Sequence, residues 1–116
     1  MHPMILASLA LNIAVLVPVC VGLATRANWT VAAYGPVTPA RGILLSIYMA
    51  LLISSAALLL MPVTAMVAGL LAVQIVYKLT TPFTVESFTN SVVVSNLAIA
   101  AVHAVTLVTI WEETFP

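Results

Sequence analysis

Charged side chains are scarce in this sequence. Among 116 residues there are three basic and three acidic ones, and the formal net charge is zero. Binding to nucleic acid relies on an excess of lysine and arginine on one surface. The composition therefore gives no basis for a nucleic acid partner, and none is expected.

Residues that commonly build catalytic or metal sites are also few. Cys20 is the single cysteine, which excludes a disulfide within the chain and any CxxC pair. The sequence has no glycine-rich phosphate loop and no set of serine, histidine and buried acid. Beside His103, a metal could find only His2, Cys20 and the acidic residues near the ends. These shortages favour a protein that is not an enzyme and has no metal site.

Apolar residues, in contrast, are abundant. They make up 64% of the chain, and the mean hydropathy of +1.26 lies far outside the range of water-soluble domains. A helix of about 20 apolar residues crosses the hydrocarbon core of a bilayer, and such runs occupy residues 3–24, 40–60, 62–79 and 89–111. The sequence predicts an all-α membrane protein whose single transmembrane domain, residues 1–116, is an antiparallel bundle of four transmembrane helices.

The connections differ in length and composition. The longest, residues 25–40, contains Trp29 and Tyr34 at positions typical of interfacial aromatics. The shortest, residues 61–64, predicts a tight hairpin, so the second and third spans should be antiparallel neighbours. Small residues in the third span would allow another helix to approach closely. They are Ala65, Ala68, Gly69 and Ala72.

The basic residues predict an orientation. Four crossings put both termini on one side, and Arg26, Arg41 and Lys78 all fall on the other. By the positive-inside rule, the two longer connections should face the cytoplasm and both termini should be non-cytoplasmic.

A polar stripe runs along the last span. Asn96, His103 and Thr106 are separated by seven and three residues, so they share one helix face. An ionisable group at membrane depth usually has a partner or a task. His103 could relay protons, ligate a metal, or ligate a tetrapyrrole in the space beside the neighbouring alanines. A neutral histidine that is hydrogen-bonded to another helix is the favoured interpretation.

Further polar side chains are expected in the interior. Arg41, Tyr48 and Ser55, spaced by seven, form a second inward stripe. Four interior polar side chains would either hold the helices together or line a binding site, and the first interpretation is favoured. They are Asn12, Tyr48, Gln74 and Asn96. Arg41, Lys78 and Glu86 are predicted to cluster on the cytoplasmic side. They would close the bundle, or form the mouth of a site for a small anion or a lipid headgroup.

Two segments carry a resemblance to a known group. Thr-Pro-Ala-Arg-Gly-Ile-Leu-Leu-Ser at 38–46 and Val-Gln-Ile-Val-Tyr-Lys at 73–78 resemble the first and last segments of helices in DoxX-like, short bacterial membrane proteins. The resemblance implies a four-helix bundle in a bacterial inner membrane and no established activity. Small multidrug-resistance transporters also have four spans, but the glutamate of their first span has no counterpart here.

Three functions follow from these patterns. The first is a non-catalytic subunit that forms an oligomer or accompanies other membrane subunits. The second is a small transporter or channel with a polar interior gated by His103. The third is a pigment- or haem-binding protein in which His103 ligates the tetrapyrrole. A membrane enzyme ranks below these, because no nucleophile has a neighbouring base.

Overall fold

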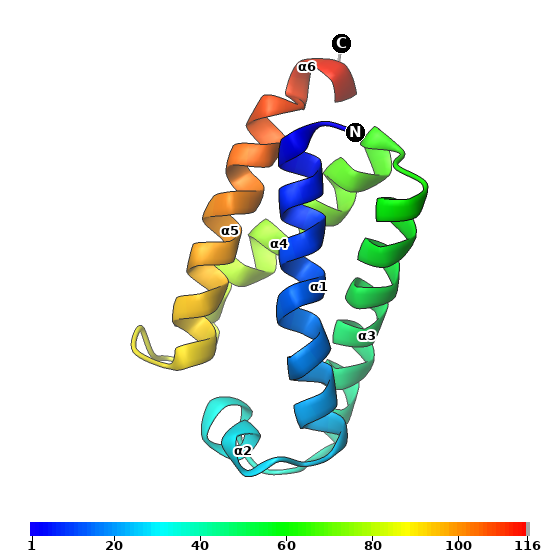
Figure 1. The fold of residues 1–116 in the computed structure, drawn as a ribbon. Coiled ribbons are helices and arrows are strands. Elements are labelled where there is room, and N and C mark those ends of the chain that lie inside the picture. Colours follow the sequence, from blue (N-terminus) through cyan, green and yellow to red (C-terminus); the bar gives the residue numbers. More distant parts are fainter. Residues whose placement is uncertain (116) are drawn as a thin grey trace.

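The computed structural model describes residues 1–115, and this part of the chain consists of helices and connecting loops without any strand. The described residues form four long helices and two short ones, whose arrangement is drawn in Figure 1. Their bounds are α1 Pro3–Ala24, α2 Asn28–Tyr34, α3 Pro39–Leu60, α4 Thr64–Thr84, α5 Ser91–Thr109 and α6 Trp111–Thr114. The helices α1, α3, α4 and α5 are long and apolar enough to span a membrane. The four predicted apolar helices are therefore confirmed.

The starts of the long helices follow from local capping chemistry. At the start of α3, Thr38 Oγ1 accepts from the Arg41 amide at 3.3 Å and Pro39 occupies the first turn. Asn90 caps α5 by accepting from the Val92 amide at 2.8 Å. These side chains satisfy amides that have no partner within the helix.

The third long helix continues five residues beyond the predicted end at residue 79. Pro82 lies inside it and cannot donate to the Lys78 carbonyl four residues earlier. The Thr81 hydroxyl donates to that carbonyl instead, at 2.7 Å. This substitute bond explains why the proline does not end the helix.

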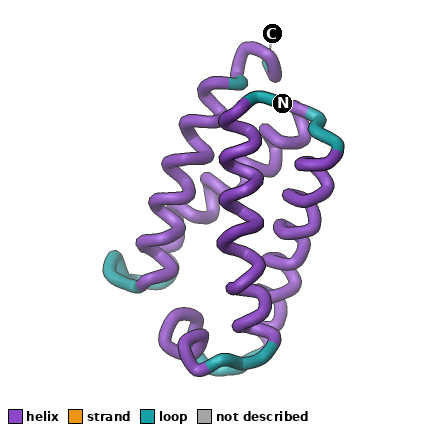
Figure 2. The backbone as a smooth tube through the Cα atoms, in the orientation of Figure 1, coloured by secondary structure: helices purple, strands orange, loops and turns teal. Residues whose placement is uncertain are grey.

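The long helices pack mainly as two pairs. The most extensive interfaces join α1 to α3 and α4 to α5, and α1 also contacts α5. Both chain ends lie at one end of the molecule in Figure 1, and the loops shown in teal in Figure 2 lie at the helix ends. The short connection between α3 and α4 does not make them close neighbours, because their mutual interface is small. The two predicted neighbours do share one core cluster, but each packs mainly on another helix.

Apolar side chains form two separate core clusters. One contains Leu9 of α1 and Leu58 of α3, and the other contains Leu16 of α1 and Leu51 of α3. On α1 the buried Asn12 lies between the two leucines, and on α3 the buried Ser55 does so. A polar layer thus separates two apolar ones.

The short helix α2, which the sequence did not reveal, is fastened to α3 by a buried arginine. Arg41 is 6% exposed. Its Nη2 donates to Thr30 Oγ1 at 2.6 Å and its Nη1 donates to the Gly35 carbonyl at 2.9 Å. Trp29 packs so closely on Gly22 of α1 that a Cβ atom there would clash with the indole. These contacts fold the 25–38 segment back under the long helices.

Replacing Arg41 by Met should release α2. The substitution keeps an unbranched stem but removes both donors from Thr30 and Gly35, which costs about 1–3 kcal/mol in a buried site. Amide hydrogen exchange of residues 28–34 should therefore accelerate by about tenfold or more. Arg26→Met is the matched control, because Arg26 carries the same charge but is exposed. Equal exchange rates in the two variants would contradict the conclusion that Arg41 fastens α2 to α3.

Candidate functional site

His103 lies at the centre of a buried hydrogen-bond network that joins three helices. Its ring is 0% exposed. Nδ1 lies 3.0 Å from Ser8 Oγ and Nε2 lies 2.9 Å from Asn12 Oδ1, both on α1. Asn12 Nδ2 then donates to Ser55 Oγ of α3 at 3.1 Å. One imidazole on α5 thus connects α1 directly and α3 through Asn12.

The partners determine which ring nitrogen carries the proton. An amide oxygen only accepts hydrogen bonds, so His103 donates from Nε2 to Asn12 Oδ1. Nδ1 of the neutral ring is then an acceptor, and the Ser8 hydroxyl donates to it. Ser8 Oγ lies 2.6 Å from Thr106 Oγ1, whose hydroxyl also lies within reach of the Val102 carbonyl at 3.0 Å. Thr106 and Ser8 are also fully buried.

This geometry determines what His103 can do. Both ring nitrogens are engaged within the bundle, so neither presents a free lone pair to a metal or a tetrapyrrole. Among residues 1–115, no group of three histidine, cysteine or acidic side chains lies close enough to hold a metal ion. His103 is thus fully buried, and each ring nitrogen lies within hydrogen-bond distance of a side chain of α1.

The two predicted stripes do face inward. Asn96, His103 and Thr106 are all buried on α5, and Arg41, Tyr48 and Ser55 are all buried on α3. Their partners lie on helices that the sequence spacing could not specify. Thr30 is the residue most easily missed, because a single hydroxyl in a loop segment carries little signal.

A second polar group lies nearer the loop end, around Lys78. Lys78 is 5% exposed, and its Nζ lies 3.4 Å from Asn96 Oδ1 of α5 and 5.1 Å from the centre of the Tyr77 ring. Asn96 Nδ2 lies 3.4 Å from Thr81 Oγ1. Both hydrogen bonds are long, since N–H···O distances in proteins are usually about 2.7–3.2 Å. This group is therefore held less tightly than the one around His103.

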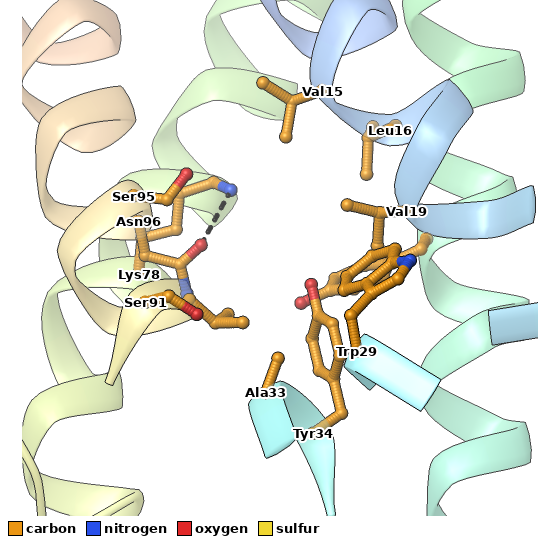
Figure 3. A pocket seen from close by; sticks show the side chains of 12 residues that line it. Val15, Leu16, Val19, Trp29, Ala33, Tyr34, Lys78, Ser91, Ser95 and Asn96 are labelled. Carbon is orange, nitrogen blue, oxygen red and sulfur yellow. Dashed lines mark hydrogen bonds between the residues drawn. The ribbon is translucent and has the colours of Figure 1, made fainter. Parts of the chain in front are cut away.

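Lys78 and Asn96 border a cavity of about 180 Å³. In Figure 3 they lie on one side of it with Ser91 and Ser95, and aliphatic and aromatic side chains lie on the other. Residues of α1, α2 and α3 complete the wall, namely Val15, Leu16, Val19, Trp29, Ala33, Tyr34 and Tyr48. An adjoining cavity of about 420 Å³ shares Ala33, Tyr34, Tyr48, Val92 and Asn96 with the first.

Two tyrosines, Tyr34 of α2 and Tyr48 of α3, border this region. The Tyr34 and Tyr48 rings meet edge to face, 6.0 Å apart. Burial is the main cause that raises the pKa of the Tyr34 phenol above its usual range, and electrostatic repulsion from Tyr48 is the second. The Tyr77 hydroxyl is buried and has no hydrogen-bond partner among the described residues.

The predicted cluster of Arg41, Lys78 and Glu86 is not formed. Arg41 donates to Thr30 and Gly35, and Lys78 donates to Asn96. Glu86 is exposed in the loop after α4, with a backbone φ of 59°. The reason is that α2, absent from the prediction, supplies the acceptors that Arg41 needs.

Gln74 also stands apart from the network. It is fully buried on α4, and its Nε2 donates to the Leu70 carbonyl of the same helix at 3.3 Å. Its Oε1 has no hydrogen-bond partner among the described residues. Gln74 therefore does not form the predicted bond between helices.

No protein-family model, curated protein or solved structure matches this chain.

Replacing His103 by Ala should destabilise the fold. The change opens a cavity and leaves Ser8 and Asn12 without their shared partner, at a combined cost of about 2–4 kcal/mol. Unfolding in mixed detergent micelles, followed by helical circular dichroism, measures this cost. Val105→Ala is the control, because Val105 is on the same helix but 53% exposed.

Combining His103→Ala with Asn12→Ala should cost less than the sum of the two single changes, by about 0.5–3 kcal/mol, because the residues share one network. Strictly additive losses of stability in the double variant would contradict the network. So would a loss of stability in His103→Ala no larger than that in Val105→Ala.

Proposed function

We propose that this chain is an integral membrane protein that crosses the bilayer four times as an antiparallel bundle. The distribution of its side chains supports the proposal. Ile43, Ile53, Val76 and Val108 are between 64% and 75% exposed, whereas His103, Gln74 and Ser55 are fully buried. Lipid solvates the apolar surface, while polar groups must find partners inside the protein.

The orientation proposed is the one that the basic residues favour. Arg26 and Arg41 lie at the end of the molecule opposite the two termini. The positive-inside rule places that end in the cytoplasm and both termini on the other side. The resemblance to DoxX-like proteins favours a bacterial inner membrane.

Within the membrane, the proposed role is that of a non-catalytic subunit that associates with a second copy of itself. The observation that carries this role is the open face of α4. Ala65 and Gly69 are exposed there, and a Cβ added to Gly69 would meet no atom within 4 Å. A groove of about 450 Å³ follows this face between α4 and α6. In lipid, helices associate through such small residues because their backbones can approach closely.

The alternative roles assigned to His103 have less support. A gate or a tetrapyrrole ligand requires an imidazole that can change partners or expose a nitrogen. In this fold the ring nitrogens lie 3.0 and 2.9 Å from Ser8 and Asn12, in a fully buried site. Breaking those contacts would separate α5 from α1, which favours a structural role.

Native mass spectrometry of the protein in lipid nanodiscs tests this role. The wild-type chain should form an oligomer, and Gly69→Leu should weaken association about tenfold or more by blocking close helix approach. Gly42→Leu is the matched control, because Gly42 on α3 is equally open. A monomeric wild-type protein would contradict association through α4. Equal loss of association in Gly69→Leu and Gly42→Leu would contradict it as well.

A further inference from the structure

Lys78 is a buried cation with unused hydrogen-bonding capacity. An ammonium group has three N–H donors, and the structure records one acceptor for Lys78, Asn96 Oδ1 at 3.4 Å. The acidic residues Glu86, Glu112 and Glu113 are exposed, and none of them lines the adjoining cavities. A buried charge needs a partner of opposite sign.

The surroundings of Lys78 contain further donors on the same side. Ser91 and Ser95 are one helical turn apart on α5 and border the cavity together with Asn96. Figure 3 shows both hydroxyls on the side of Lys78, across the cavity from α1 and α2. This side therefore offers one positive charge and neighbouring hydroxyl donors to an anion.

The opposite side of the cavity is apolar and aromatic. Val15 and Val19 of α1 face Trp29 and Tyr34 of α2 around the same space. The adjoining cavity of about 420 Å³ extends the space along Tyr34 and Tyr48. Such walls suit a hydrocarbon chain or an aromatic ring, with the charged end held by a few polar groups.

We propose that this cavity binds a carboxylate carried on an apolar or aromatic body, with Lys78 as its counter-ion. A carboxylate carries one negative charge and so neutralises one lysine. A phosphate monoester carries about −1.5 to −2 and would leave excess negative charge beside a single lysine. The apolar body lies along α1 and α2. The acid comes either from the bilayer, as a fatty acid, or from solution, as an aromatic acid.

Binding can be followed through Trp29, which lies in the cavity wall. The chain has two tryptophans, so Trp111→Phe leaves Trp29 as the sole indole emitter in the full-length protein. In nanodiscs of zwitterionic lipid, palmitate and benzoate are the probes, and methyl palmitate and benzamide are their neutral counterparts. At least one acid should change the emission saturably, and its neutral counterpart should bind about tenfold more weakly or worse.

Variants connect binding to the cavity. Lys78→Met should weaken binding of the acid by about 30-fold or more, as expected when one partner of a buried charge pair is removed. Lys78→Arg should retain most of the affinity. Arg26→Met, which removes an exposed charge, should have no effect. Ala33→Leu keeps Lys78 but fills space shared by both cavities, and it should also abolish binding.

The outcomes distinguish an acid from the bilayer, an acid from solution, and a cavity that binds neither. Binding of palmitate alone identifies a membrane-derived acid, and binding of benzoate alone identifies a soluble one. If Lys78→Met does not fold, the neutral counterparts and Ala33→Leu decide. An emission change that is absent for both acids, equal for acid and neutral counterpart, or unaffected by Ala33→Leu would overturn the proposal.

Discussion

The fold depends on one constraint, which is that polar side chains buried among apolar helices must satisfy one another. The His103 ring meets this constraint with Ser8 on one nitrogen and Asn12 on the other. Asn12 passes the connection to Ser55. Three helices are thereby held in one register, because sliding any of them by a turn would leave these groups buried without partners, at about 1–3 kcal/mol each.

Two polar groups both involve α5, one around His103 and one around Lys78 of α4, and they differ in how much of their hydrogen-bonding capacity is used. Around His103, the hydroxyls and the amide use their hydrogen-bonding capacity on one another, in a layer between two apolar clusters. Around Lys78, the contacts are long and a cavity adjoins the ammonium group. The saturated group suits a structural role, and the unsaturated one suits the binding of a ligand.

Sequence periodicity predicted which residues face inward but not which residues they meet. The spacing of Asn96, His103 and Thr106 identifies one helix face, because that geometry is local. Partner choice depends on tertiary packing: the short loop after α3 suggested an α3–α4 pair, whereas α3 packs on α1. The expected charge cluster failed for a similar reason, since Arg41 turns to the unanticipated α2. The candidate cavity needs five helices and no local pattern encodes it.

We infer that His103 is a neutral hydrogen-bond hub rather than a group exposed to solvent or ligand. Nitrogen-15 NMR of the imidazole in lipid bicelles tests it most directly. We expect a protonated, donating Nε2 and an accepting Nδ1, with a ring proton that exchanges slowly with deuterated water. Resonances averaged between tautomers, together with rapid exchange, would contradict it.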